Sequence, residues 1–182
     1  MSKPVEKECR SIEHYTPKNV VDAVHNYFKL RGFPGILLDP ATSADNPTVA
    51  ANWYTKEHNG LAHPWPNGTF VNPPYGREIR QWVAKIIDEA KQGREIVALL
   101  PCSRSEQAYW QKLWNASLTG DVQVRKRLAF LHRSDDMKYT PAKGNPYSSQ
   151  LLCYNGTFNH CVKAFRHLGT CKAYRMVVRG PE

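Results

Sequence analysis

The stretch FVNPPYG at residues 70–76 constrains the fold more than any other part of the chain. It begins as an apolar, strand-like run and stops at two consecutive prolines, which have no N–H group to donate to a β-ladder. We therefore expect a strand that ends in a rigid loop carrying Asn72 and Tyr75. The Asn72 amide oxygen and the Pro73 carbonyl can each accept an N–H from a flat, amino-bearing ring on which Tyr75 stacks. A plain turn between a strand and a helix is the alternative for this motif alone.

Length, charge and cysteine content limit the classes of protein that fit the chain. With 182 residues, 41% of them hydrophobic, the chain suits one well-cored domain. The net charge of +9 favours a polyanionic partner, although a solvated basic face is the alternative. The five cysteines form no Cys-x-x-Cys pair, which argues against a disulfide framework, and their spacing predicts no metal site.

The N-terminal residues carry charges and lack an apolar core of signal-peptide length. No stretch of the sequence approaches the roughly 20 apolar residues that a membrane helix needs. We therefore expect a soluble protein of the cytoplasm that makes no contact with a membrane.

Strands and helices alternate along the first two thirds of the chain, which predicts a parallel sheet covered on both faces. Thr16 is suited to cap the first helix, with Pro17 in its first turn. In such a sheet Asp39 and Asn72 follow two strands that end at the same edge, where ligands bind. We expect helices over residues 16–30, 43–51, 77–92 and 105–115, and strands over residues 36–39, 53–55, 69–72 and 95–100.

The pattern changes after Gly120. Residues 122–131 and 149–154 are typical of two strands that pair as an antiparallel hairpin at one end of the sheet, and a polar loop joins them. Residues 158–168 have the pattern of a basic amphipathic helix. The expected organisation is a mobile leader over residues 1–12, one domain over 13–157, and a basic helix and tail over 158–182 that packs on or extends that domain.

Several short motifs follow one another along the chain in a characteristic order and spacing. Each of them alone is weak evidence of a relationship. They are EHYTP at 13–17, LDPA at 38–41, GLAHPW at 60–65, VNPPYG at 71–76, LLP at 99–101, RLAF at 127–130 and NPYSS at 145–149. On these motifs the chain resembles the S-adenosylmethionine-dependent amino-methyltransferases of nucleic acids. More narrowly, it resembles the phage-type DNA N-6-adenine methyltransferase (Dam) family over about residues 12 to 156.

The resemblance implies a Rossmann-like α/β methyltransferase that binds S-adenosylmethionine and methylates N6 of adenine in DNA. It also implies a phage or prophage origin and action in a bacterial cytoplasm. The residues implied for catalysis on the target base are Asn72, Pro73, Pro74 and Tyr75. The residues implied for the cofactor are Tyr15, Thr16 and Pro17 at its methionine end, and Asp39, Pro40 and Ala41 beneath it.

The chain departs from the family pattern before its Gly-Leu pair. The family usually has acidic residues there, whereas this chain has His58 and Asn59. Asn59 can still hydrogen-bond to the cofactor as a neutral group, so the expected cofactor residues also include Asn59, Gly60 and Leu61.

DNA is the expected partner, with its adenine flipped out of the duplex and its phosphates bound by exposed cations. We expect a short or loose recognition site and action as either a monomer or a dimer. The alternatives are an RNA-base amino-methyltransferase and a non-catalytic nucleic-acid-binding relative. The cations expected at the DNA are Arg77, Arg104, Arg125, Lys126, Arg127, Arg133, Lys138 and Lys143.

Overall fold

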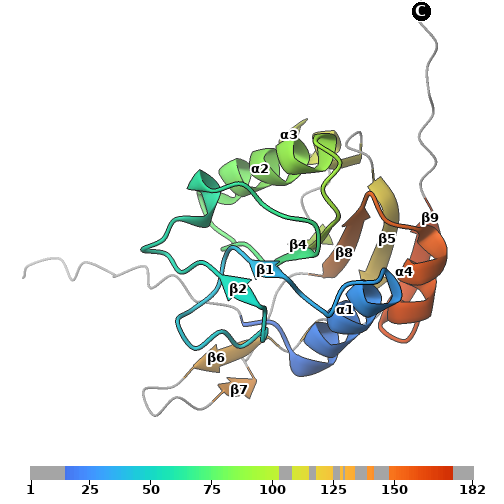
Figure 1. Cartoon of the computed structure of the whole chain (residues 1–182), viewed down its shortest axis with the longest axis horizontal. Coiled ribbons are helices and arrows are strands. Elements are labelled where there is room, and N and C mark those ends of the chain that lie inside the picture. The colour runs from blue at the N-terminus through green and yellow to red at the C-terminus, as the bar shows by residue number, and fades with distance from the viewer. Residues whose placement is uncertain are drawn as a thin grey trace, which may run out of the picture.

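The computed structural model describes residues 15–102, 108–114, 118–124, 128, 130–133, 139–141 and 148–173. The leader expected at residues 1–12 lies outside these ranges. The described residues form a mixed α/β fold around a seven-stranded sheet, in the order β2-β1-β3-β4-β8-β5-β9 (Figure 1).

The first half of the sheet is parallel, as the sequence predicts. Strand β1 (Leu38–Asp39) pairs with β2 (Asn52–Trp53) and with β3 (Thr69–Val71), and β3 pairs with β4 (Ile96–Pro101). Leu38 lies opposite Thr69, so the residues that follow β1 and β3 come out at the same edge of the sheet. We call this side the carboxyl edge.

The second half of the sheet is antiparallel, and here the predicted arrangement is partly wrong. Strand β5 (Leu118–Val124) does pair antiparallel with β8 (Ser149–Tyr154), but β8 lies between β4 and β5 rather than at the end of the sheet. The outer position is taken by β9 (Gly169–Ala173), which the sequence pattern does not show. The single strand expected over residues 122–131 is also divided, because β5 ends at Val124 and Leu131 begins a separate pair, β6 (Leu131–Arg133) and β7 (Tyr139–Pro141).

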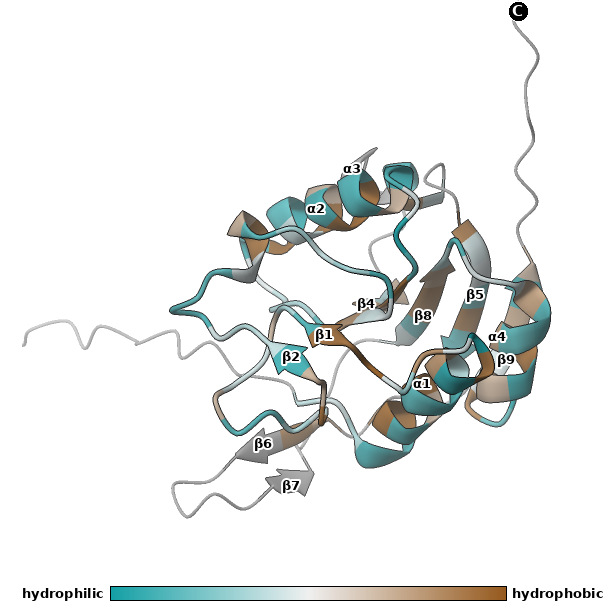
Figure 2. Cartoon of the chain, viewed as in Figure 1, coloured by the Kyte–Doolittle hydropathy of each residue, from teal (hydrophilic) through white to brown (hydrophobic). Residues whose placement is uncertain are grey.

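Helices cover both faces of the sheet (Figure 1). α1 (Lys18–Leu30) contacts α4 (Phe158–Phe165) on one face, and α2 (Ile79–Lys91) contacts α3 (Ala108–Trp114) on the other. Figure 2 shows the apolar residues of α1 and α2 turned toward the sheet, which is why these helices form here. The face predicted for the first helix is buried, and its members are Val20, Val21, Val24, Tyr27 and Phe28.

Two local predictions for the N-terminal part of the described chain are wrong. No helix forms over residues 43–51, where the chain makes turns with Asn46 and Val49 at φ of 46° and 52°. A β-branched residue rarely adopts a positive φ. Here the Val49 N–H bonds to the Asn46 carbonyl at 2.9 Å, and the Ala51 N–H bonds to the Ile36 carbonyl at 3.0 Å. The cap of α1 is also different: its N-cap residue is Pro17 rather than Thr16.

Candidate active site

The proline-rich tip lies where the sequence predicts it, directly after β3. Asn72 is half-buried, Pro73 is buried and Pro74 is exposed. The Asn72 side chain is held by a distant segment, because its Nδ2 donates a hydrogen bond of 3.0 Å to Oγ1 of Thr16, 56 residues earlier. This bond joins a residue predicted to bind the base with one predicted to bind the cofactor.

Tyr75 is half-buried and is fixed at both ends of its side chain. Its hydroxyl donates to the carbonyl oxygen of Leu99 at 3.3 Å, which anchors the ring to β4. The ring meets Phe130 edge to face, with centroids 6.0 Å apart and an interplanar angle of 86°. Burial raises the pKa of the Tyr75 phenol well above its usual value, so the hydroxyl stays protonated and can donate. The ring is therefore held in one orientation before any ligand arrives.

The N-terminal segment is fixed beside the same tip. The backbone N–H and carbonyl of Tyr15 bond to the carbonyl and N–H of Leu131, each at 3.0 Å, so the segment pairs with the first residue of β6. Thr16 follows and is only 7% exposed. Both residues sit at one end of a cavity of about 620 Å³.

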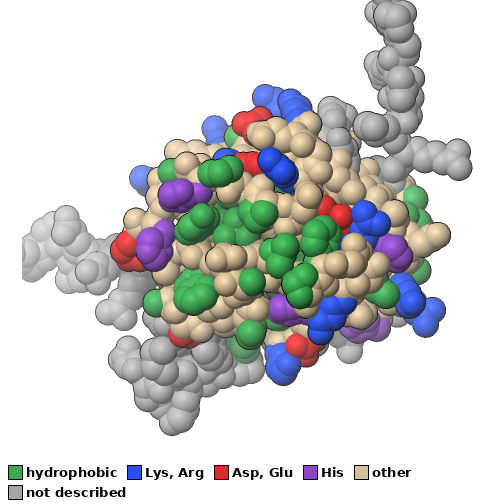
Figure 3. All heavy atoms as spheres, viewed as in Figure 1, with side chains coloured by type: hydrophobic (Ala, Val, Ile, Leu, Met, Phe, Trp, Pro, Cys, Tyr) green, Lys and Arg blue, Asp and Glu red, His purple; other side chains and the backbone are tan. Residues whose placement is uncertain are grey.

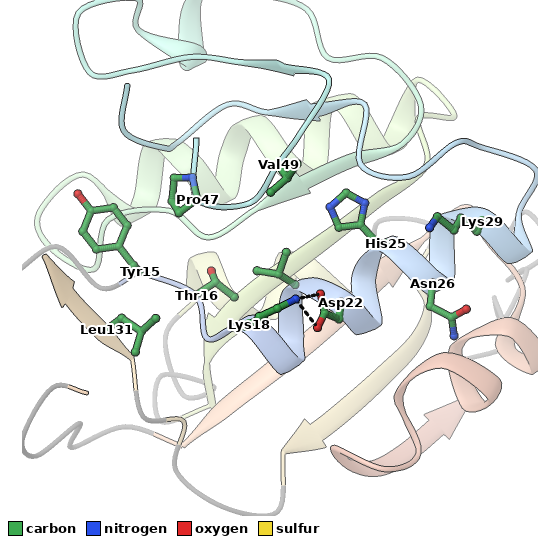
Figure 4. Close-up of a pocket in the computed structure, with 11 residues that line it drawn as sticks. Tyr15, Thr16, Lys18, Asp22, His25, Asn26, Lys29, Pro47, Val49 and Leu131 are labelled. Carbon is green, nitrogen blue, oxygen red and sulfur yellow. Dashed lines mark hydrogen bonds and ion pairs between the residues drawn. The ribbon is translucent and has the colours of Figure 1, made fainter. Parts of the chain in front are cut away.

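This cavity runs between α1 and the loop that carries Pro47 and Val49 (Figure 4). Lys18 and Asp22 lie on its wall and form an ion pair with Nζ and Oδ1 2.8 Å apart. Among the described residues, its lining includes none from 39–41 or 59–61. Tyr15 and Thr16, predicted to bind the methionine end of the cofactor, thus line a cavity. The other two predicted cofactor segments, 39–41 and 59–61, do not line it.

Asp39 stands at the carboxyl edge but uses its carboxylate within the fold. It is 2% exposed, and its two oxygens accept hydrogen bonds from Thr48 Oγ1 at 2.7 Å and from the Ala41 N–H at 3.1 Å. Burial raises the pKa of Asp39 to about 6, although both hydrogen bonds act to lower it. The carboxylate therefore holds the loop after β1 in place.

The segments around Pro40 and Gly60 pack directly against each other. A Cβ added to Gly60 would lie 2.0 Å from the Pro40 carbonyl oxygen, so only glycine fits. The Gly60 carbonyl accepts a 2.9 Å hydrogen bond from the indole of buried Trp65. Asn59 is exposed and has a φ of 51°, a conformation that asparagine tolerates better than most residues. Two predicted cofactor segments, 39–41 and 59–61, thus form one unit.

Sequence reasoning missed the residues that shape the loop above the cavity. His25 accepts the Ile36 N–H at Nδ1 (3.3 Å), so its Nε2 carries the proton and donates to the Thr48 carbonyl at 2.8 Å. Thr48 in turn bonds to Asp39. The only sequence signal for these contacts is a histidine beside the apolar face of α1, which does not identify its partners.

The cysteine at the neighbouring strand tip is unsuited to nucleophilic chemistry. Cys102 follows β4, and burial raises the pKa of its thiol to about 11, with nearby Asp121 adding to the effect. The group therefore stays a thiol at neutral pH. Within the described ranges, no group of three or more His, Cys, Asp or Glu side chains is placed to hold a metal ion. A search of the same residues finds no helix long and apolar enough to cross a membrane.

Of the cations expected at DNA, Arg77 is the one whose side chain the structure describes. It is exposed and lies two residues beyond Tyr75. Arg133 belongs to β6, and its side chain is not described. The remaining six, Arg104, Arg125, Lys126, Arg127, Lys138 and Lys143, lie outside the described residues.

One face of the molecule carries exposed apolar side chains among polar ones (Figure 3). Among the described residues, the large hydrophobic side chains with the highest exposure are those of Val49, at 73%, and Trp53, at 40%. Lysines and arginines lie mainly around the margin of this face (Figure 3).

Comparison with protein-family models gives a match over most of the chain. The family model described as DNA N-6-adenine-methyltransferase (Dam) matches residues 5–167, which is most of the chain and includes both strand tips and the cavity. No curated protein matches the chain.

Proposed function

Because the chain belongs to the DNA N-6-adenine-methyltransferase (Dam) family, we propose that it transfers a methyl group from S-adenosylmethionine to N6 of a flipped adenine in DNA. The family establishes the reaction at its general level, and the roles of individual residues are our proposal. In this proposal the parallel half of the sheet is that of a Rossmann-like methyltransferase. The tip proposed to bind the base and the 39–41 segment proposed to bind the cofactor then follow neighbouring parallel strands at the carboxyl edge.

The residues near Thr16 suit the methionine end of the cofactor. The cavity of about 620 Å³ falls in the range of small-molecule sites, roughly 300–1,000 Å³. Its wall offers both a cation and an anion, Lys18 and Asp22, to the carboxylate and the ammonium of an amino acid. Asp39 supports this site indirectly, because it holds the loop between β1 and Thr48. Asn59 and Leu61 would contact the nucleoside end, where Gly60 fixes their segment against Pro40.

The chemistry falls to two fixed acceptors. The N6 lone pair of adenine is delocalised into the ring, so the amine is a poor nucleophile until it becomes pyramidal. The Asn72 amide oxygen and the Pro73 carbonyl each accept one N6–H, which favours the tetrahedral amine of the transition state. S-adenosylmethionine supplies an electrophilic methyl group on a positively charged sulfur.

The N6 lone pair forms the new bond to the methyl carbon as the carbon–sulfur bond breaks. The electron pair of the broken carbon–sulfur bond stays on sulfur. N6 then gives up one proton to water. No covalent enzyme intermediate is required, which agrees with the protonated thiol of Cys102. Holding both partners in line supplies much of the remaining acceleration.

A base reaches this tip only after leaving the duplex, at a cost of a few kcal/mol. Tyr75 recovers part of that cost by stacking, about 1–3 kcal/mol. The Asn72 oxygen is buried in the structure, so the entering base displaces the atoms that cover it. The acceptor then works away from water, where a hydrogen bond has its largest electrostatic effect.

Recognition of DNA sequence is proposed to be short or loose. Phosphate contacts from cations such as Arg77 then supply most of the affinity, which falls steeply with salt.

The observation that carries the proposal is the hydrogen bond between Asn72 and Thr16, which joins the proline-rich tip to the wall of the cavity. The test is incubation with methyl-labelled S-adenosylmethionine and unmethylated DNA, followed by digestion to nucleosides. We expect the label in N6-methyldeoxyadenosine, and mapping of the modified positions defines the recognition site. A parallel reaction contains RNA in place of DNA, and label in the RNA reaction alone would support the RNA-base alternative. Failure to bind S-adenosylmethionine in calorimetry, with DNA still bound, would support a non-catalytic module.

A further inference from the structure

Thr16 occupies a position from which threonine normally caps a helix, yet its hydroxyl serves a different group. The N-cap residue of α1 is Pro17, and no side-chain cap bond forms there. The first-turn N–H groups of Val20 and Val21 bond to the Pro17 carbonyl at 3.0 and 3.1 Å. The Thr16 hydroxyl instead accepts the N–H of Asn72.

The backbone on both sides of Thr16 is restrained. Before it, Tyr15 forms two hydrogen bonds with Leu131, and after it α1 begins. Thr16 itself is 7% exposed, so water competes little for its hydroxyl. A hydroxyl with its backbone fixed on both sides presents its oxygen at a defined place, which is what an anchor for another side chain requires.

The direction of the hydrogen bond matters because the two ends of an amide differ. Asn72 has one end that donates, Nδ2, and one that accepts, Oδ1. With Nδ2 bound to Thr16, the oxygen is the end turned away from Thr16, and it is buried until a base enters the site. An amine such as N6 of adenine needs an acceptor there, since a rotated amide would set its NH₂ against the NH₂ of the base.

We propose that Thr16 is a positioning residue that holds the Asn72 side chain in place, with Nδ2 on the Thr16 hydroxyl and the amide oxygen as the acceptor for the substrate amine. The inference rests on the proposed function and adds to it a second role for a residue expected only to bind the cofactor. Thr16 then connects the two halves of the site, because it lines the cavity and its hydroxyl holds the side chain proposed to accept from the base. It takes no part in the transfer itself.

The test compares Thr16→Val with Thr16→Ser in methyl transfer from labelled S-adenosylmethionine to DNA. Valine keeps the shape of threonine and removes the acceptor, so we expect kcat to fall about tenfold, the effect of one lost hydrogen bond. The KM for DNA and the Kd for S-adenosylmethionine should change less than about threefold, the spread expected for contacts left intact. Serine keeps the hydroxyl and should restore most of the rate.

A cycle with Asn72→Asp separates orientation from packing. A carboxylate has two equivalent acceptors, so it has no wrong end. If Asn72→Asp retains measurable transfer, Thr16→Val should cost less in that background than in the wild type, and an equal cost would overturn the proposal. If Asn72→Asp is inactive, the ratio of the Thr16→Val and Thr16→Ser rates decides.

Folding is checked by circular dichroism. If Thr16→Val does not fold, Thr16→Ala and Thr16→Ser replace the pair, since both lack the methyl group and differ only in the hydroxyl. If Thr16→Val binds S-adenosylmethionine more weakly and its kcat returns to the wild-type value at saturating S-adenosylmethionine, the whole effect belongs to the cofactor contact and the positioning role is overturned. A wild-type enzyme that methylates DNA, with Thr16→Val equally active, would overturn this inference alone. A wild type that methylates no DNA would instead overturn the proposed function.

Discussion

The two strand tips at the carboxyl edge use their polar side chains in opposite ways. Asn72, after β3, is held by a hydrogen bond to Thr16, which lies 56 residues away along the chain. Asp39, the last residue of β1, is held by Ala41 and Thr48, which lie 2 and 9 residues away. One tip is tied to a distant element, and the other is tied to its own loop.

This difference indicates how each tip can act on a ligand. The nitrogen of the Asn72 amide is fixed by Thr16, so the position of its oxygen, the proposed acceptor for the base, is fixed as well. The Asp39 carboxylate is nearly fully buried and shapes a loop, so binding on that side depends on backbone and shape. We therefore expect changes at Asn72 to affect the rate of methyl transfer, and changes around Asp39 to affect stability and cofactor affinity.

The largest effect is expected at the base-side tip. Asn72→Ala removes one of the two proposed N6 acceptors and should lower kcat by about 10²–10³-fold, as does loss of one oxyanion-hole donor. The Kd for S-adenosylmethionine should remain within about threefold, because that contact is not removed. Radiolabel transfer and calorimetry measure the two quantities. Near wild-type turnover in this variant would show that the tip is only a turn.

The next effect concerns the unit formed by Pro40 and Gly60. Gly60→Ala places a Cβ 2.0 Å from the Pro40 carbonyl oxygen, so the backbone must move. Overpacking of this severity should cost about 3 kcal/mol of unfolding free energy. Denaturant unfolding measures it, and S-adenosylmethionine affinity should fall with it.

Gly76→Ala is the matched control for this stability measurement. A Cβ at Gly76 meets nothing within 4 Å, so the same change should leave the unfolding free energy within about 0.5 kcal/mol of the wild type. Equal losses in the two variants would mean that backbone flexibility, rather than the Pro40 contact, requires glycine at residue 60.

The sequence could predict elements and motifs but not these contacts. Prolines and apolar runs locate β3, β4, α1 and α2 well, because local periodicity and the missing proline N–H act within a few residues. The antiparallel half was harder, since the position of β8 between β4 and β5 depends on pairing between distant strands. β9 was missed because its residues are mostly exposed and lack an apolar alternation.

The same distinction applies to the site. A proline-rich tip and an acidic tip on one edge follow from strand order, which the sequence pattern indicates. The partner of Asn72 does not follow from it, because Thr16 has a helix-start context that predicts a cap. The sequence likewise predicts that Asp39 faces a ligand. The structure shows instead that Asp39 is buried and accepts a hydrogen bond from Thr48.

The buried carboxyl of Asp39 makes a prediction about pH. Burial raises its pKa from 3.8 to about 6 on folding, so the folded protein holds this proton more tightly than the unfolded chain does. The free energy of unfolding is therefore highest below about pH 4 and falls as the pH rises through 6. The shift of about two units corresponds to about 3 kcal/mol. Asp39→Asn keeps the shape, stays neutral and should lose this pH dependence. Unfolding free energies of both proteins between pH 4 and 7 measure the difference, and parallel curves would contradict it.

The smallest effect is expected for the ring of Tyr75, and it separates the two tips again. Tyr75→Ala removes the stacking surface and should raise the KM for DNA about 10-fold, within the 1–3 kcal/mol of a base–aromatic stack. Tyr75→Phe loses only the bond to the Leu99 carbonyl and should raise the KM for DNA about threefold or less.

Tyr54→Ala is the control on the other side of the edge, because Tyr54 stacks on His63 next to β1, the strand of Asp39. That variant should leave the KM for DNA unchanged. If Tyr54→Ala and Tyr75→Ala raise the KM for DNA equally, the base contacts both sides of the edge. The proposal that the base binds only at the Asn72 tip would then be wrong.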